Sequence, residues 1–444
     1  MSVGVDALNG PHFFGALPER WAEERLYDIA ELRTSNVDKK SAEDEIPVRL
    51  CNYVDVYYND SITAGIDFME ATATQGQIDR FSLKAGDVVI TKDSESPDDI
   101  GIPALVAEPI ENLVCGYHLT ILRPDQSRIV SGYLSYALAS RVAGYQCYLA
   151  ANGVTRFGLT YQGTKNIRVA LPSVSEQERI AAFLDWKTAQ IDGLIGKKQE
   201  LIAKLKEKRL AVITQAVTKG LDPKAPLRDS GTPWLGKVPR HWEIMKYGYR
   251  THVAEGQVDP EIEPYNEMLL IAPNHIESNT GRIIDLTTAQ DQGAISGKYL
   301  VRRGDVVYSK IRPHLNKCAV ATFDGLCSAD MYPIRTDQGL HPAFLAYWML
   351  AQPFLDYATE SSMRVAMPKL NRETLSAAPL VVPPPNEQEQ IAAFLDVATV
   401  KTDTFLEKAE AAVTFLTEYR SALITTATTG KIDLRGWQAD KEAA

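Results

Sequence analysis

The chain has 444 residues, of which 45% are hydrophobic and 23% charged, a composition typical of a globular protein with two or three domains rather than a disordered chain. Its net charge of −10 argues against nucleic-acid binding unless basic residues gather on one face. It has no apolar run long enough to cross a bilayer and no signal-peptide pattern at its N-terminus, so we expect a cytoplasmic protein without membrane contact.

The first predicted element is a domain at residues 1–174, which begins with a short leader. The motif Pro18-Glu-Arg-Trp21 opens its folded part. A turn glycine, Gly86, introduces the β-rich run Asp87–Ile90, and a helix is predicted near residues 132–143. Short strands together with helices indicate a mixed α/β domain.

Residues 175–219 form the first of two long predicted helices. Pro172 disfavours helix upstream, Ser175 is a candidate N-cap with Glu178 at capping-box distance, and Gly220 ends the helix. Apolar residues then follow in steps of three and four, which predicts one apolar seam, as in a coiled coil. The seam residues predicted for this helix are Ile180, Leu184, Ile191, Leu194, Ile202, Leu205 and Val212.

A linker rich in glycine and proline, residues 220–238, leads to a second domain at residues 239–385. This domain repeats features of the first: Pro239-Arg-His-Trp242 opens it, a turn glycine introduces the run Asp305–Tyr308, and a helix is predicted near residues 342–357. It is therefore also predicted to be mixed α/β, although the two domains have otherwise diverged in sequence.

Residues 386–430 form the second long predicted helix, which repeats a phrase of the first. Glu387–Asp396 matches Glu176–Asp185 at every position but one, with an offset of 387 − 176 = 211 residues. A match of this length identifies an internal repeat. The tail, residues 431–444, is similar to the linker, and we expect it to return to the first domain. The seam residues predicted for the second helix are Ile391, Leu395, Phe405, Val413, Leu416 and Leu423.

The linker length favours one direction for the helix pair. Each helix has about 40 residues and is roughly 60 Å long. Parallel helices would force a linker of about 20 residues to return that whole length, whereas antiparallel helices need only a short connection. We therefore predict an α+β fold: two mixed α/β domains joined by two long antiparallel coiled-coil helices, with a domain at each end and a pseudo-twofold axis. The alternative is a pair of ordinary core helices.

Three segments carry a resemblance to a known family. They are Asp229–Glu243, the Pro-x-x-x-Glu-Gln phrase that opens both helices, and the ending Thr429-Gly-Lys-Ile-Asp433. Together they resemble a signature of type I restriction–modification specificity subunits. The resemblance covers nearly the whole chain in two copies and is weakest inside the two domains.

The resemblance implies that the domains and the helices have different functions. Each domain would be a target-recognition domain that reads one half of a bipartite, asymmetric site in double-stranded DNA. The helices would act as a spacer and as the docking surface for two DNA adenine methyltransferase (M) subunits. Motor–nuclease (R) subunits would join the complex for cleavage.

Candidate DNA contacts follow from the chemistry of recognition. Phosphate contact needs Lys, Arg or exposed amides, and base reading favours Arg with guanine and Asn or Gln with adenine. Such groups are concentrated at 310–317 and 361–369, and the 211-residue offset relates the second segment to Ala151–Gly158. The alternative for each is a solvated surface loop. The predicted DNA-binding residues are Lys92 (the counterpart of Lys310), Arg156, Lys310, Arg312, His314, Asn316, Lys317, Arg364 and Lys369.

Several catalytic motifs are missing from the sequence. There is no Asn-Pro-Pro-Phe/Tyr loop of an amino-methyltransferase, since Pro383-Pro-Pro-Asn386 has the reverse order, and there is no phosphate-binding Gly-x-x-x-x-Gly-Lys-Ser/Thr loop. No His-Glu-x-x-His zinc helix occurs either. We therefore expect no cofactor, no metal and no catalysis by this chain. Five scattered cysteines without a Cys-x-x-Cys motif are predicted to be reduced structural thiols: Cys51, Cys115, Cys147, Cys318 and Cys327.

The favoured hypothesis is a sequence-specific DNA-binding subunit that directs the methylation and cleavage carried out by its partners. Three alternatives remain: the specificity subunit of a methylation-only or single-polypeptide-partner system, a coiled-coil interaction scaffold that has lost DNA binding, and an enzyme with an unrecognised active site. A scaffold would show no preference among DNA sequences when tested with its partners.

Overall fold

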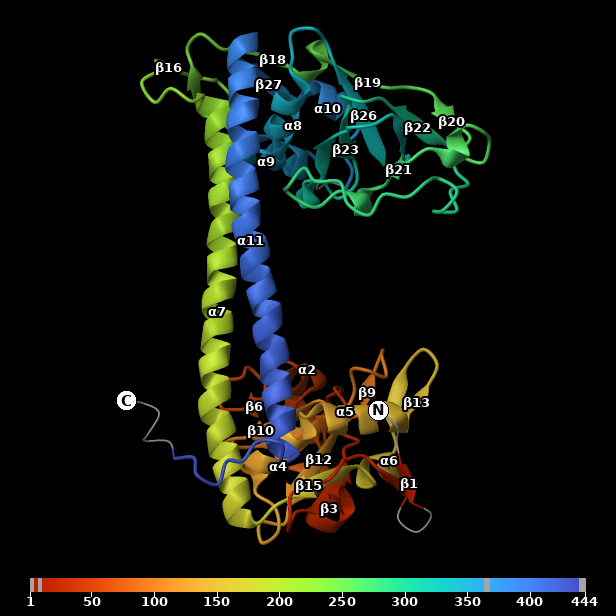
Figure 1. The fold of residues 1–444 in the computed structure, drawn as a ribbon, viewed down its shortest axis with the longest axis vertical. Coiled ribbons are helices and arrows are strands. Elements are labelled where there is room, and N and C mark those ends of the chain that lie inside the picture. The colour runs from red at the N-terminus through yellow and green to blue at the C-terminus, as the bar shows by residue number, and fades with distance from the viewer. Residues whose placement is uncertain (1–3, 7–9, 363–367, 439–444) are drawn as a thin grey trace. The chain divides into compact units, whose positions relative to one another are not determined.

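Two long helices, α7 (Val174–Lys219) and α11 (Pro385–Thr428), dominate the computed structural model (Figure 1). The structure describes residues 4–6, 10–362 and 368–438. It divides into two units, one made of Met1–Lys197 with Ala412–Ala444 and the other of Lys198–Ala411. Each unit therefore contains one domain and part of both long helices. Among the described residues, no helix is both long and apolar enough to cross a membrane.

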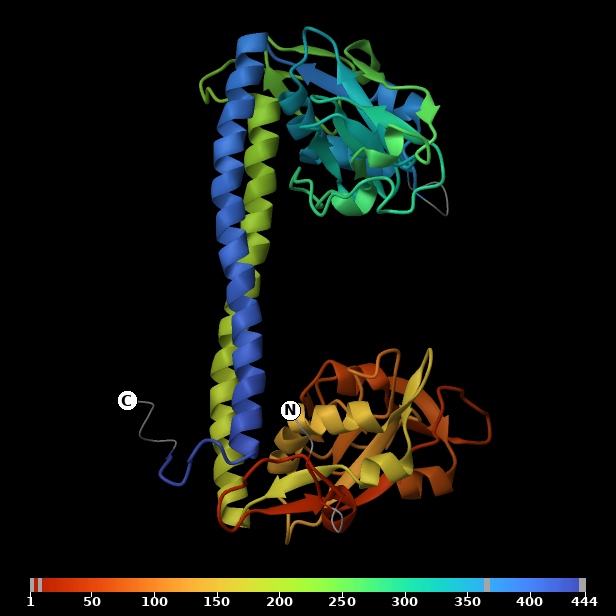
Figure 2. The same ribbon diagram turned by 45° about the vertical axis from the view of Figure 1, so that its right-hand side comes forward.

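The two helices run antiparallel in each unit, as predicted (Figures 1 and 2). In the first unit, Leu184 near the start of α7 shares a hydrophobic core with Leu423 near the end of α11. In the second unit, Val217 near the end of α7 shares a core with Ile391 near the start of α11. The helices end where Gly220 and Gly430 adopt positive φ angles of 75° and 70°, which glycine tolerates without strain.

Most of the predicted seam positions are buried or half-buried, and two are exposed. Leu194 and Phe405 are 48% and 50% exposed, and the next residues, Ile195 and Leu406, turn inward instead. One residue corresponds to about 100° around a helix, so a neighbouring apolar residue faces a different side. The remaining predicted seam residues are buried or half-buried: Ile180, Leu184, Ile191, Ile202, Leu205, Val212, Ile391, Leu395, Val413, Leu416 and Leu423.

The first domain is built on a five-stranded sheet. Its central strand β8 (Val88–Thr91) is buried on both faces, because Val88 and Ile90 face a core shared with α7 while Val89 faces a second core. The sheet order is β4 (Ala30–Thr34), β12 (Leu119–Pro124), β8, β10 (Pro103–Val106) and β6 (Ser61–Ile62). The other sheets are β11 (Leu113–Cys115), β5 (Ile46–Cys51) and β7 (Met69–Ala73); β13 (Ala151–Gly153), β14 (Phe157–Leu159) and β9 (Asp93–Ser94); β15 (Arg168–Leu171) and β3 (Ala22–Arg25); and β1 (Gly4–Asp6) and β2 (Gly10–His12).

Short helices cover this domain. One of them, α4, supplies Tyr133 and Leu134 to the core that also contains Ile180 and Leu184 of α7, so it packs between the sheet and the long helix. The short helices are α1 (Leu26–Ile29), α2 (Tyr53–Tyr57), α3 (Gln75–Phe81), α4 (Ser131–Leu138), α5 (Arg141–Ala150) and α6 (Tyr161–Lys165).

The second domain repeats this topology. Its first sheet has the order β19 (Thr251–Val253), β26 (Met331–Thr336), β23 (Val306–Ser309) and β24 (Cys318–Val320), which matches β4, β12, β8 and β10. Its second sheet has the order β20 (Gln257–Val258), β22 (Lys298–Val301), β25 (Gly325–Cys327) and β21 (Leu270–Ile271). The parallel pair β21 and β25 corresponds to the parallel pair β5 and β11. The internal repeat is therefore present in the fold as well as in the sequence.

The remaining elements of the second domain complete the correspondence. The pair β18–β27 matches β3–β15, and α8, α9 and α10 follow in the order of α4, α5 and α6. Their bounds are β16 (Leu227–Asp229), β17 (Lys237–Pro239), β18 (Glu243–Lys246), β27 (Pro379–Val382), α8 (Pro342–Leu350), α9 (Gln352–Ser362) and α10 (Arg372–Ala377), with 3₁₀ turns at Tyr247–Tyr249, Tyr265–Glu267, Pro273–His275 and Pro313–Leu315.

A buried glutamine attaches each domain to its long helix. Gln177, fully buried, accepts a hydrogen bond from the Val130 N–H at 2.8 Å and donates to the carbonyls of Arg128 and Pro172. Gln388, 1% exposed, accepts from the His341 N–H at 2.7 Å and donates to two carbonyls in the same arrangement. Both glutamines lie in the repeated phrase, so the two copies of this phrase make the same attachment.

The tail returns to the first unit, as predicted. Its Leu434 is 7% exposed and belongs to the core that α7 shares with the first domain. The Trp437 ring lies 5.4 Å from Phe183 and 6.0 Å from Trp186, measured between ring centroids. Leu434 and Trp437 of the tail therefore pack against the first turns of α7.

The seam can be tested by a matched pair of variants. Leu184→Ala should lower the free energy of unfolding by about 3 kcal/mol, because it leaves a cavity at a fully buried position. Leu194→Ala should change it by less than about 0.5 kcal/mol, because this side chain is half exposed. Urea denaturation followed by tryptophan fluorescence measures both. Equal effects at the two positions would contradict the assigned seam.

Candidate nucleic-acid interface

Each domain places a lysine at the same point of its fold, directly after the central strand of the main sheet. Lys92 follows β8, and its backbone N–H donates to the His118 carbonyl at 2.9 Å. Lys310 follows β23, and its N–H donates to the Asp330 carbonyl at 3.0 Å. His118 and Asp330 each stand immediately before the neighbouring strand, so the two lysines are structural counterparts.

The fold brings a second predicted segment next to each lysine. In the first domain, Leu159 of the β13–β14 hairpin donates its N–H to the Lys92 carbonyl at 2.8 Å. In the second domain, Leu370 donates to the Lys310 carbonyl at 2.8 Å, and Lys369 pairs with Ile311. Segments that are far apart in the sequence therefore form one surface in each domain.

The site in the first domain centres on Asp93. One of its carboxylate oxygens lies 2.6 Å from the Lys92 ammonium and 2.7 Å from Nδ1 of His118. Burial raises the pKa of Asp93, but the hydrogen bonds from Lys92 and His118 outweigh it and hold the pKa below its ordinary value. The lysine is thus oriented by a charged partner rather than left to rotate in solvent.

The hairpin beside this group carries exposed side chains at its end. Arg156 is exposed, and Val154 is 90% exposed. Gly153 has a φ of 151°, and a Cβ added there would lie 1.9 Å from the Arg156 carbonyl oxygen, so the turn requires glycine. The turn therefore holds Arg156 at the end of a closed hairpin.

A groove next to Lys92 holds two further lysines that the sequence reasoning missed. It is lined by Asn36, Lys39, Lys40, Lys92 and Tyr117, among others. Lys39 and Lys40 follow β4 in a loop, a position at which lysine is common for solubility alone. Only the folded structure shows that they share a groove with Lys92.

The site in the second domain is more crowded with cations. Lys310 is half-buried and lies 5.3 Å from the centre of the Tyr332 ring. Burial lowers the pKa of Lys310, the nearby cations Lys369 and Arg372 lower it further, and Asp330 opposes them. Clustered cations of this kind are stabilised by an anion such as a phosphate group. Arg372, which the sequence reasoning missed, also pairs with Glu255 at 2.7 Å.

The loop after Lys310 divides into exposed and internal residues. Arg312 and His314 are exposed, as is Lys369. Lys317 is half-buried and donates to the Pro273 carbonyl at 2.6 Å. Arg364 lies outside the described residues.

Asn316 corrects one prediction. This side chain is 1% exposed, and its amide donates to Oδ1 of Asn279 and to the Leu350 carbonyl, both at 3.1 Å. An amide committed in this way is not available to an adenine edge. Asn316 instead holds the loop against the body of the domain.

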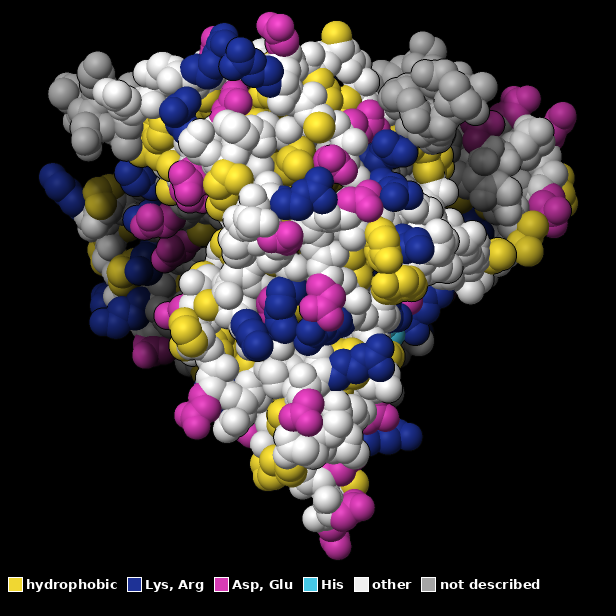
Figure 3. Space-filling view, turned by 90° about the horizontal axis from the view of Figure 1, so that it is seen from below, with side chains coloured by type: hydrophobic (Ala, Val, Ile, Leu, Met, Phe, Trp, Pro, Cys, Tyr) yellow, Lys and Arg dark blue, Asp and Glu magenta, His cyan; other side chains and the backbone are white. Residues whose placement is uncertain are grey.

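The face drawn in Figure 3 and the five thiols add no other candidate site among the described residues. Figure 3 shows a face on which basic and acidic side chains are intermingled rather than separated into patches. All five cysteines are buried and unpaired. In the part of the chain that the structure describes, no three His, Cys, Asp or Glu side chains are arranged to hold a metal ion.

Comparison with known proteins identifies the family. The model of the type I restriction modification DNA specificity domain matches residues 18–204 and again residues 241–414. These two matches cover most of the chain and coincide with the structural repeat. The chain therefore belongs to the type I restriction–modification DNA specificity family.

Individual relatives carry names from the same family. The chain is 33% identical over 290 residues to the EcoDI type I restriction enzyme specificity subunit of Escherichia coli, an alignment that covers 62% of this chain and 64% of that subunit. It is 22% identical over 383 residues to a putative MjaX specificity subunit of Methanocaldococcus jannaschii, covering 85% and 86% of the two chains.

A solved structure shares the fold. This structure was determined in a study of the structural basis underlying complex assembly and conformational transition of the type I R-M system. The match has a TM-score of 0.67 at 16% identity and covers 94% of this chain and all of that one. The predicted fold class, with two mixed domains and long helices, is confirmed.

The corrected role of Asn316 can be measured. Asn316→Ala should lower the free energy of unfolding of the second domain by about 2 kcal/mol, because the Leu350 carbonyl loses its buried donor. Its φ of 48° also suits asparagine better than alanine. His314→Ala, in the same loop but exposed, should change stability by less than about 0.5 kcal/mol. Thermal denaturation of both variants decides between an internal role and a surface role for Asn316.

Proposed function

We propose that the protein is the DNA-recognition subunit of a type I restriction–modification complex. Each domain reads one half of a bipartite, asymmetric site, and the helices set the gap between the halves and dock the methyltransferase subunits. The observation that carries this proposal is the pair of lysine sites, which occupy the same point of a repeated fold but differ in their side chains.

The difference between the two sites supports an asymmetric target. The first combines Lys92 and Asp93 with His118, an arrangement that offers both a cation and an acceptor. The second places Lys310 and Arg372 over the Tyr332 ring, with Lys369 as a further nearby cation. Cations fix a protein on the phosphate backbone, while the differing neighbours supply different contacts to base edges. Two such readers favour two unlike half-sites.

The proposed partners are two DNA adenine methyltransferase subunits and the motor–nuclease subunits. A relative of known fold comes from work on type I complex assembly, which supports a multi-subunit function here. Helix α11 also exposes large apolar side chains, among them Val397 at 72% and Phe415 at 68%, which offer contact area to another subunit. Since the target is cellular DNA, we propose that this non-catalytic subunit works in the cytoplasm.

The alternative of a scaffold that has lost DNA binding is disfavoured by the second-domain site. Lys310 lies half-buried beside the cations Lys369 and Arg372, an arrangement to which an anion such as a phosphate group is well suited. A pure interaction scaffold has no use for such an arrangement in the domain. Mapping adenine methylation in host genomes with and without the protein tests the proposal, which requires a two-part motif with a fixed gap that disappears with the protein.

The second-domain site can be tested by the double variant Arg312→Ala, Lys369→Ala. In the complete complex it should weaken DNA binding about tenfold at physiological salt and make the log–log salt dependence shallower by about 2. Lys224→Ala, an exposed lysine in the linker, is the control and should leave both quantities unchanged. Affinity measured over a salt series gives the answer, and an unchanged slope for the double variant would place this loop outside the interface.

A further inference from the structure

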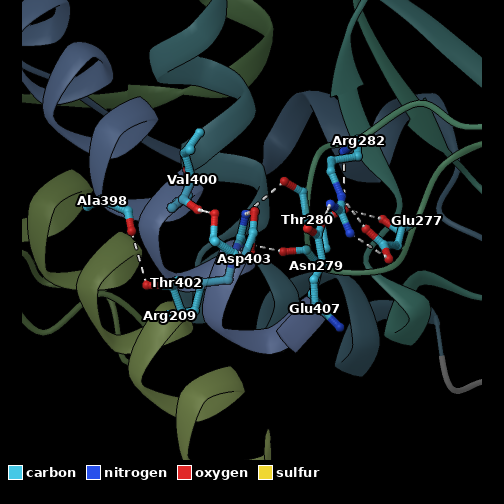
Figure 4. Close-up of polar contacts among 12 residues, drawn as sticks. Arg209, Glu277, Asn279, Thr280, Arg282, Ala398, Val400, Thr402, Asp403 and Glu407 are labelled. Carbon is cyan, nitrogen blue, oxygen red and sulfur yellow. Dashed lines mark hydrogen bonds and ion pairs between the residues drawn. The ribbon is translucent and has the colours of Figure 1, made fainter. Parts of the chain in front are cut away.

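A single buried arginine joins three parts of the second unit. Arg209 of α7 is 6% exposed, and its guanidinium contacts Asp403 of α11 at 2.8 and 3.3 Å (Figure 4). The same group donates to the carbonyls of Asn279 and Thr280 in the second domain, at 2.6 and 2.9 Å. Lysine cannot replace this fork, because one ammonium does not reach a carboxylate and two carbonyls in these directions at once.

The domain turn that receives Arg209 is attached to α11 by a second cation. Arg282 binds Glu277 of its own turn at 2.7 Å and also pairs with Glu407, one helical turn beyond Asp403 (Figure 4). The turn is closed by the bridge between Ile276 and Ile283. The turn therefore rests on the helix pair through two arginines.

This attachment lies well away from the buried glutamine. From Gln388 to Asp403 the distance along α11 is about 22 Å. Near Gln388 the domain also shares a hydrophobic core with Ile391 and Leu395 of α11. The Arg209 and Arg282 contacts extend this attachment further along the helices, and they limit how far the domain can tilt against the helix pair of its own unit.

The attachment leads directly to the candidate DNA loop. Oδ1 of Asn279 accepts a hydrogen bond from Asn316 at 3.1 Å, and the Asn279 N–H donates to the Asn316 carbonyl at 3.1 Å. Asn316 belongs to the loop that exposes Arg312 and His314. A short series of hydrogen bonds therefore links the helix α7 to the loop.

The first unit contains the same pair at the positions that the repeat predicts. Arg420 of α11 contacts Asp192 of α7 at 2.9 and 3.2 Å and also binds Asp60 of the first domain. Arg420 and Asp192 are the 211-residue counterparts of Arg209 and Asp403. The domain partners differ, two carbonyls in one unit and a carboxylate in the other. The arginine and its helix partner are retained in both.

We infer that Arg209 and Arg420 are positioning residues for DNA recognition: each fixes its own domain at a second point on the helices and thereby restricts the gap between half-sites that the complex accepts. The inference rests on the proposed function. Neither residue needs to touch DNA, and each acts through the angle at which its domain presents its loops.

The test compares DNA duplexes that differ only in gap. The natural half-sites and gap are first taken from the methylated motif of the host genome. Duplexes with that gap, one base pair fewer and one base pair more are then methylated by the full-length protein assembled with its methyltransferase. For Arg209→Lys, the preference for the natural gap should fall by about tenfold, which corresponds to the loss of one charge-assisted hydrogen bond in the positioned state.

Two further variants keep the result interpretable. Lys204→Met removes an exposed ion pair with Glu200 on the same helix and should leave the gap preference unchanged. Arg282→Gln removes the second attachment at a side chain that is 43% exposed, so folding is retained, and it should relax the gap preference in the same direction as Arg209→Lys. This variant carries the test if Arg209→Lys does not fold.

The outcomes separate the possible explanations. Simple destabilisation lowers all methylation rates together and leaves their ratio unchanged, which would overturn the inference. Altered base preference within a half-site would also overturn it, because Arg209 would then act on reading rather than on spacing. If the wild-type complex methylates no duplex with sequence preference, the proposed function fails first and independently of Arg209.

Discussion

The buried side chains of Gln177 and Gln388 are the constraint on which the rest of the structure depends. Each uses one acceptor and both amide hydrogens to satisfy backbone groups that no water reaches. A buried polar group without its partner costs more than its hydrogen bond contributes when made, so the glutamine fixes the local contact between the start of the helix and its domain. A second repeated contact supports this geometry, because Tyr136 and Tyr347 each donate to an aspartate about two turns further along the helix.

Much of the fold was predictable because the two copies of the repeat make the same contacts between helix and domain with the same residues. The residues that tie helix to domain recur almost unchanged at the 211-residue offset, so the repeat and its two long helices could be read directly. The seam could not be read everywhere. At 194–195 and 405–406 two apolar residues are adjacent, and periodicity alone does not rank them. The packing of the second helix decides that Ile195 and Leu406 turn inward while their neighbours stay exposed.

The candidate site was predictable only in part, for a related reason. Lys92 and Lys310 follow a strand motif that the two domains share, so their correspondence was visible in the sequence. Asn316 was misassigned because its burial depends on Asn279, a residue in a distant turn that itself rests on α7. Arg372 and the Lys39–Lys40 pair gave no signal, since isolated basic residues near a domain surface are ordinary. Only the folded structure shows that they lie beside Lys92 and Lys310.

The discontinuity of the first unit has a consequence for biosynthesis. This unit consists of Met1–Lys197 and Ala412–Ala444, whereas the second unit is one uninterrupted segment, Lys198–Ala411. A ribosome therefore synthesises all of the second unit before it synthesises the C-terminal segment of the first unit, Ala412–Ala444. At 5–20 residues per second the interval is about 10–40 s. During that time the aromatic surface of Phe183 and Trp186, which Trp437 later covers, stays open on the nascent chain and is available to chaperones. The first unit therefore cannot complete its folding until the C-terminal segment of the chain has been made.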